Sequence, residues 1–76
     1  SVELSRNGLL ILRILMENAG SIISRSELMD ELWQTDVFVD DNTLTVNVNR
    51  LRRSLQSIDV PDDFITTRRG LGYVVR

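Results

Sequence analysis

Apolar residues recur at helical spacing through most of the chain. In the stretch "TLTVNVNRLRRSL", residues 43–55, they follow one another at steps of four, three and four residues: Leu44, Val48, Leu51 and Leu55. Such steps place the side chains on one face of a helix, and that face is expected to pack against a core. Similar apolar faces run through "RNGLLILRILMEN" and "SELMDELW". The pattern therefore predicts three helices.

Each predicted helix follows a residue that can cap it. Ser5 precedes the first helix, and either Asp40 or Asp41 precedes the third, which is expected to end near residue 56. Ser24 stands three residues before Glu27 in "SRSE", the capping-box pattern, so the second helix is expected from there to about residue 33. Side-chain oxygens at such positions accept hydrogen bonds from N–H groups that a helix leaves unpaired in its first turn.

The C-terminal stretch "DFITTRRGLGYVVR" has a different pattern. Two runs of β-branched or aromatic residues, "FITT" and "YVV", are separated by "RRGLG", whose glycines can adopt the positive φ that a tight turn requires. This pattern predicts a β-hairpin with two adjacent arginines at its tip. Three helices followed by such a hairpin make an α+β fold, the helix-turn-helix with a wing.

The charge of the chain is unevenly distributed. Residues 1–49 contain three arginines and eight acids, a net of −5, whereas residues 50–76 contain six arginines and three acids, a net of +3. Binding to a polyanion depends on the local field rather than on the total of −2. All nine basic residues are arginine, whose planar fork suits bidentate contacts to phosphate or guanine. The alternative explanation for the exclusive use of arginine is the codon and amino-acid bias of the source genome.

The inventory of side chains argues against an enzyme, a metal site or a cofactor. The chain has no cysteine and no histidine, and it lacks a glycine-rich phosphate loop. Its acids are scattered and are better interpreted as solvated faces than as a catalytic pair. The longest apolar run, "GLLILRILM", is interrupted by Arg13 and is far shorter than the ~20 residues of a membrane span. We therefore expect a protein that works away from membranes, in the cytoplasm.

Three segments together resemble a known family. "SRSELMDELW", "DDNTLTVNVNRLRRSL" and "ITTRRGLGYVV" are similar to the C-terminal winged-helix effector domain of OmpR/PhoB-class response regulators, which belong to bacterial two-component systems. The resemblance covers essentially all 76 residues. The run "LWQTDVFVDDNTLTVNVNRLR" resembles the branch that controls resistance to bacitracin and related cell-envelope peptides in Gram-positive bacteria.

The resemblance implies an output domain of a phosphorelay. Residues 1–76 are then expected to form the DNA-binding domain of a longer protein whose receiver domain takes phosphate from a cognate histidine kinase. It also implies binding to promoter direct repeats as a dimer and contact with RNA polymerase. On its own, the chain is expected to be monomeric or weakly associated.

The chain departs from the family pattern near its start. Gly8 and Leu9 stand where a glutamate and an aromatic residue are usual. Gly8 cannot form the reciprocal cap and lowers the stability of the helix by about 1 kcal/mol, so the first helix should fray at its start. The four-stranded sheet that opens the family domain is largely missing, because only "VELS" can remain of it. We expect the first helix to be partly uncovered, with Leu10 exposed, and the unfolding midpoint to be low.

The polar side of the third predicted helix carries one valine. A recognition helix in the major groove meets thymine methyl groups, which Val46 suits, while Asn49 can pair with adenine. Arg50 and Arg53 can reach guanine or the flanking phosphates. The alternative for Val46 is a residue stranded in solvent, and Arg52 fits a structural salt bridge as well as a phosphate contact. The contacts expected from this helix are Asn42, Thr43, Val46, Asn47, Asn49, Arg50 and Arg53.

The hairpin and the loop before the third helix suggest two further contacts. By family position Arg69 enters the minor groove, and Thr67 and Tyr73 give hydroxyls to phosphates, although "RRGLG" also fits a solvated turn. The family contacts RNA polymerase through the loop, for which the candidates are Gln34, Asp36, Val37, Phe38 and Asp40. The apolar loop residues and Trp33 are either tucked under the domain or offered to another protein. A winged helix used for protein association alone is the rival interpretation.

Overall fold

Three helices and one hairpin make up residues 5–75, which are the residues that the computed structural model describes. Helix α1 spans Arg6–Glu17, α2 spans Arg25–Gln34 and α3 spans Asp41–Gln56. After a 3₁₀ turn at Asp62–Phe64, strands β1 (Ile65–Arg68) and β2 (Gly72–Val75) follow. The predicted winged helix-turn-helix order is confirmed. Of residues 2–5, which were assigned to the end of an N-terminal sheet, residues 2–4 lie outside the described residues, and Ser5 is the N-cap of α1.

The three helices start at the residues that the sequence indicated. Ser5, Ser24 and Asp40 are the N-caps, and each side-chain oxygen accepts a hydrogen bond from the backbone N–H three residues later, at 3.0, 3.0 and 2.8 Å. Asp40 rather than Asp41 therefore caps α3. The Ser24 hydroxyl also donates to the Glu27 carboxylate at 3.1 Å, so the two ends of the capping box meet through their side chains.

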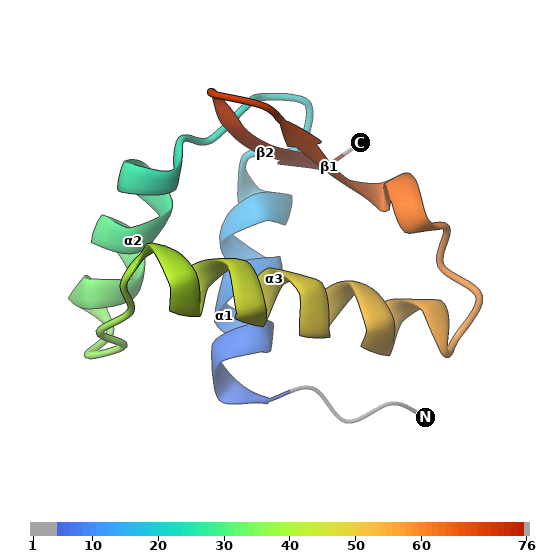
Figure 1. Ribbon diagram of the computed structural model, residues 1–76, viewed down its shortest axis with the longest axis horizontal. Coiled ribbons are helices and arrows are strands. Elements are labelled where there is room, and N and C mark those ends of the chain that lie inside the picture. Colours follow the sequence, from blue (N-terminus) through green and yellow to red (C-terminus); the bar gives the residue numbers. More distant parts are fainter. Residues whose placement is uncertain (1–4, 76) are drawn as a thin grey trace.

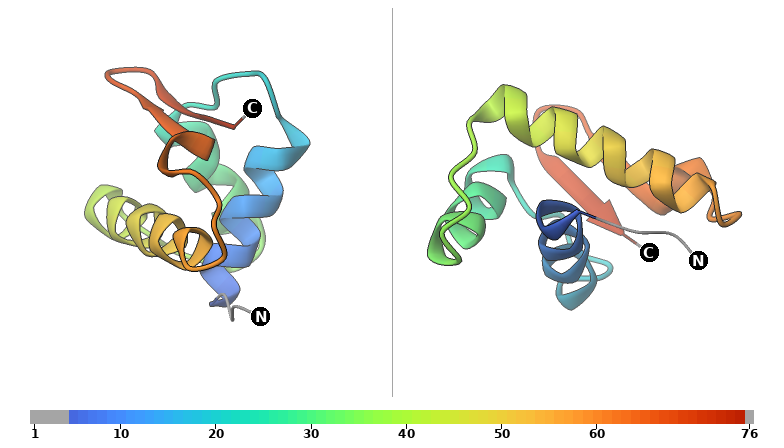
Figure 2. Two further views of the ribbon diagram at one scale, coloured as in Figure 1. Left: turned by 90° about the vertical axis from the view of Figure 1, so that its right-hand side faces the viewer. Right: turned by 90° about the horizontal axis from the view of Figure 1, so that it is seen from below.

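Helix α1 lies at the centre of the domain and contacts α2, α3 and β2. Figure 1 shows α3 passing in front of α1, with α2 beside it and the hairpin across one end, and Figure 2 shows the same helices from two other sides. The apolar face predicted for α3 is buried at all four positions, which are Leu44, Val48, Leu51 and Leu55. The core therefore holds α3 by one face and leaves its opposite face to solvent.

The outer surface of α1 differs from the prediction at one residue. Leu10 is partly buried and packs against the core, so the prediction that it is exposed was wrong. Leu9 and Met16 are instead more than half exposed, and together with Leu12 they line a shallow apolar groove. These three residues follow at steps of three and four, so they share one face of the helix, whereas Leu10 is turned by about 100° from Leu9.

The hairpin is anchored to the segment before α2. Strands β1 and β2 are antiparallel, with Thr67 opposite Tyr73. On its other edge Tyr73 pairs with Ile23, through N–H···O=C bonds of 2.9 and 3.0 Å in both directions. Gly72 has φ +148°, and a Cβ atom there would collide with the carbonyl group of Ile23. A glycine is therefore required at this close approach.

Candidate nucleic-acid interface

The solvent face of α3 carries the polar set that its sequence predicts. Val46 is 45% exposed, and exposed side chains of α3 lie around it, namely Asn42, Asn49, Arg50 and Arg53. This face is rich in hydrogen-bond donors and includes one apolar group, because arginine is donor-only and each asparagine amide has two N–H groups. The cap at Asp40 and the buried opposite face fix which residues point outward.

Asn47 does not belong to this exposed set. It is 8% exposed, and its Nδ2 donates to the carbonyl oxygen of Thr43 at 2.8 Å. The amide is thus used inside α3, one turn back along the helix. The structure does not support the prediction of Asn47 as a DNA contact, whereas Thr43 itself is exposed in the first turn of α3.

Arg52 ties α3 to the wing. Its Nε and Nη2 donate to the carbonyl oxygen of Ile65 at 3.1 and 2.8 Å, and Nη2 also donates to the Thr67 hydroxyl at 2.6 Å. Of the two roles that the sequence left open for Arg52, the structure favours the structural one. The partners are a backbone carbonyl and a hydroxyl of β1 rather than a carboxylate.

Tyr73 is a packing residue at the junction of α2, α3 and the wing. It is 3% exposed, and its hydroxyl accepts a hydrogen bond from Nη1 of Arg25 at 2.6 Å. The guanidinium carbons of Arg25 and Arg52 lie 5.8 and 6.0 Å from the centre of its ring, within cation–π range. The expectation that this hydroxyl reaches a phosphate is therefore not supported, because the residue is buried in the fold.

Arg25 is a residue of the site that was not predicted from the sequence. Besides Tyr73, this residue donates to the carboxylate and the carbonyl oxygen of Asp41 at 3.1 and 2.6 Å, and to the hydroxyl of Thr45 at 2.9 Å. It therefore links α2, α3 and β2. The sequence contained only a weak indication of this role, namely an arginine in the first turn of a helix, where the helix dipole disfavours a positive charge unless it has partners.

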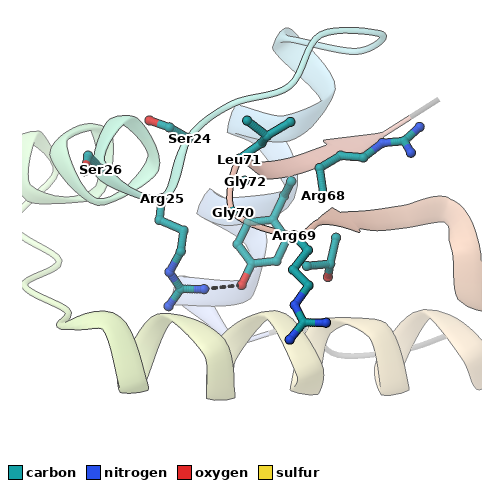
Figure 3. A pocket seen from close by; sticks show the side chains of 10 residues that line it. Ser24, Arg25, Ser26, Arg68, Arg69, Gly70, Leu71 and Gly72 are labelled. Atoms are coloured by element: carbon teal, nitrogen blue, oxygen red, sulfur yellow. Dashed lines mark hydrogen bonds between the residues drawn. The ribbon is translucent and has the colours of Figure 1, made fainter.

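The tip of the wing is exposed. Between β1 and β2 the Leu71 N–H donates to the Arg68 carbonyl oxygen at 2.8 Å, and Gly70 takes φ +76°. Figure 3 shows the hollow between this turn and the start of α2, where Arg68 and Arg69 leave the turn in different directions. Arginines from α2 and from the wing thus border one hollow. An anionic ligand is the partner that such a lining favours.

The loop between α2 and α3 combines the two alternatives that the sequence left open. Val37 and Val39 are buried, so the predicted contact of Val37 with a partner protein is not supported. Phe38 is 71% exposed and Trp33 is 52% exposed, with their ring centres 6.1 Å apart in an edge-to-face arrangement. The loop therefore offers an aromatic pair to solvent while its two valines anchor it.

Two aspartates shape the same loop. Asp36 has φ +62° and ends α2, since the next N–H, that of Val37, turns back to the Leu32 carbonyl oxygen at 2.9 Å. The carboxylate of Asp40 accepts hydrogen bonds at the start of α3, where the backbone N–H and then the hydroxyl of Thr43 lower its pKa below the usual value. Asp40 therefore stays ionised at neutral pH and favours the helix start.

Among residues 5–75, no cluster of three or more potential metal ligands occurs. In the same part of the chain, every helix is too short or too polar to cross a bilayer. The chemistry available on the surface is therefore that of arginine forks, amides, hydroxyls and a few apolar groups, which is suited to recognition.

These features define a class of protein. Residues 1–75 match the family described as "Transcriptional regulatory protein, C terminal", and the chain belongs to this family. It is 47% identical over 76 residues to the sensory transduction protein BceR of Bacillus subtilis (strain 168), covering 100% of this chain and 32% of BceR. The chain spans about a third of the length of the curated relatives that it matches.

Solved structures resemble the domain closely. The C-terminal domain of the nisin resistance regulator NsrR, a lantibiotic response regulator, superposes with a TM-score of 0.87 at 39% identity, covering 97% of this chain and 74% of that one. The DNA-binding domain of Klebsiella pneumoniae RstA, solved in complex with the RstA box, gives a TM-score of 0.78 at 32% identity, covering 97% and 73%. The winged-helix fold of the chain is thus shared with domains of response regulators.

Proposed function

We propose that this domain binds double-stranded DNA sequence-specifically, with α3 in the major groove and the wing on the minor groove. The observation that carries the proposal is the exposed set on one face of α3, in which Val46 lies among Asn49, Arg50 and Arg53. An α-helix fits the major groove of B-DNA, where base edges present acceptors, donors and the thymine methyl group. The related RstA domain was solved on its own DNA box, which supports the same use here.

Within α3, each exposed side chain has a distinct role in the proposal. Val46 contacts a thymine methyl group, and Asn49 forms hydrogen bonds with a purine edge. Arg50 and Arg53 bind guanine or flanking phosphates, while Asn42 and Thr43, exposed in the first turn, add contacts to the backbone of the DNA. Base contacts set the specificity, and phosphate contacts set the register.

The wing contributes a second contact. Arg69 lies at the exposed tip of the hairpin, in the turn between β1 and β2, where a guanidinium can enter a narrow minor groove. A narrow A·T-rich groove has an enhanced negative potential, so groove shape is recognised as well as sequence. Thr67 is exposed on β1, and its hydroxyl accepts a hydrogen bond from Arg52, which leaves its proton for a phosphate oxygen.

In the longer protein, we propose, the domain is the output of a two-component response regulator that controls transcription in the cytoplasm, without enzymatic activity of its own. A receiver domain, phosphorylated by a cognate histidine kinase, controls pairing of two copies on direct repeats. The names of the relatives support this, since BceR is a sensory transduction protein and NsrR is a nisin resistance regulator.

RNA polymerase is the proposed partner of the loop between α2 and α3. Phe38 and Trp33 form its exposed aromatic centre, and the exposed residues Gln34, Asp36 and Asp40 form a polar rim. Aromatic anchors surrounded by polar residues are typical of the centres of protein interfaces.

The same aromatic pair favours the second candidate function, a winged helix used for protein association without specific DNA readout. Salt dependence distinguishes the two. For DNA binding, the logarithm of the affinity should fall with the logarithm of the salt concentration, with a slope of about −0.9 for each phosphate neutralised. Fluorescence anisotropy with a labelled promoter duplex at several salt concentrations measures this slope. A duplex that is not bound even at low salt would leave the association role as the better account.

A further inference from the structure

The amide of Asn49 has a defined orientation. Its Oδ1 accepts a hydrogen bond from Nη1 of Arg52 at 3.2 Å, one turn further along α3. A guanidinium has only donors, so the amide atom that faces it has to be the oxygen. The two N–H groups of Asn49 therefore lie at the other end of the amide, away from Arg52.

Arg52 can hold this orientation because it is itself fixed. Three of its hydrogen bonds go to β1, two to the carbonyl oxygen of Ile65 and one to the hydroxyl of Thr67, at 2.6 to 3.1 Å. The guanidinium also lies over the ring of the buried Tyr73. The guanidinium of Arg52 therefore has little freedom to move relative to the wing. The position of its Nη1, which contacts Asn49, is fixed by the fold rather than by a ligand.

We propose that Arg52 is a positioning residue for base recognition, which holds Asn49 with its N–H groups outward so that Asn49 recognises guanine. This inference rests on the proposed binding of α3 in the major groove. Guanine presents two acceptors there, O6 and N7, whereas adenine presents the acceptor N7 and the donor N6. Bidentate pairing with adenine requires the amide oxygen to face the base, but the bond to Arg52 directs that oxygen toward the wing. The adenine contact expected from the sequence is thereby replaced by a guanine contact.

Asn49→Asp tests the donor role of the amide. The substitution keeps the shape of the side chain and replaces the outward N–H groups by an acceptor, while the inner oxygen can still meet Arg52. Aspartate accepts from the N4 amino group of cytosine, so the preference at one base pair should change from guanine to cytosine, with guanine disfavoured about ten-fold. Selection of bound duplexes from a randomised library, followed by competition titration at that base pair, measures the change.

Arg52→Lys tests the positioning role. Lysine keeps the charge but lacks the planar fork, so the amide of Asn49 becomes free to turn and adenine becomes acceptable. The preference for guanine over adenine should shrink about ten-fold at the base pair that Asn49 contacts, with the ranking at the other base pairs retained. Arg13→Lys is the control and should change nothing, since Arg13 lies on α1 and pairs with Glu17 at 3.7 Å.

The outcomes separate the inference from the proposed function. An Arg52 that only stabilised the fold would lower the affinity for every duplex alike, and that result would overturn the inference. So would a wild-type preference for adenine at the Asn49 base pair, or a profile that Asn49→Asp leaves unchanged. If circular dichroism shows that Arg52→Lys does not fold, the Asn49→Asp profile decides alone. A wild-type chain without preference at any base pair contradicts the proposed function itself.

Discussion

The hydroxyl oxygen of Tyr73 lies 2.6 Å from Nη1 of Arg25, so the second strand of the wing is bonded to the first turn of α2. Arg25 is bonded at the same time to Asp41 at the start of α3. The two helices of the helix-turn-helix and the wing are thus joined at one guanidinium. This junction sets the angle between the wing and α3 before any DNA is bound.

Tyr73→Phe removes the hydroxyl from this junction and keeps the buried ring. We expect the free energy of unfolding to fall by about 1 kcal/mol, a typical value for one hydrogen bond, because Arg25 retains its other partners. Urea denaturation of wild type, Tyr73→Phe, Arg25→Ala and the double variant gives the coupling between the two residues. Strictly additive losses would mean that the bond contributes nothing to stability.

Gly72→Ala should disrupt the pairing between the wing and the segment around Ile23. The added Cβ collides with the carbonyl group of Ile23, and φ +148° is unfavourable for alanine, so we expect a loss of about 3 kcal/mol or more. Gly20→Ala is the matched control, since Gly20 also has a positive φ, +85°, but its Cβ would meet no atom within 4 Å. That variant should lose only about 1–2 kcal/mol. Equal thermal shifts for the two alanines would contradict the close approach at Ile23.

The start of α3 should respond to acid. Hydrogen bonds from the backbone N–H and the hydroxyl of Thr43 lower the pKa of Asp40, so its ionised form stabilises the folded state. Because the folded pKa is below the unfolded one, this contribution is complete above the usual aspartate range, near pH 4, and is lost as the pH falls through the folded pKa. Asn is also a good N-cap but does not titrate. The difference in stability between wild type and Asp40→Asn should therefore decrease between pH 6 and about pH 3 in denaturant titrations, and a constant difference would count against this cap.

The sequence predicted what local rules control. The caps at Ser5 and Ser24 and the buried face of α3 follow from residue types at fixed spacing, and the structure confirms them. For the third helix the sequence left Asp40 and Asp41 open, and the structure selects Asp40. The errors concern tertiary contacts. Tyr73 is buried because it pairs with Ile23, fifty residues earlier in the chain, and no local pattern reports such a pairing.

Two further residues show the same limit within single elements. Asn47 is a residue type that often contacts DNA in the major groove. In the structure it lies at the edge of the buried face of α3, and its amide donates to a backbone carbonyl of the same helix. For Val37 the sequence left open whether the loop contacts a partner or packs into the core. The left-handed conformation of Asp36 directs Val37 into the core. Periodicity locates a face but not its edges.

Arg69→Ala tests the minor-groove role of the wing. If Arg69 recognises a narrow groove, its loss should weaken binding most on duplexes whose flank is an A-tract, because the potential is concentrated there. If Arg69 only contacts phosphates, every duplex should be weakened alike and the salt slope should decrease by about 0.9. Affinities of wild type and variant on A-tract and G·C flanks, at two salt concentrations, separate these cases.

If the proposed function is right, the exposed face of α3 distinguishes one base pair from another. This is measured by a competition titration at physiological salt, with a duplex selected from a random library against a scrambled duplex of the same composition. We predict that the selected duplex binds about a thousand-fold tighter or more, and that Val46→Ala and Asn49→Ala each lower discrimination at a single base pair by ~1–3 kcal/mol without changing binding to the scrambled duplex. Equal affinity for the two duplexes, or a uniform loss across all base pairs in both variants, would contradict it.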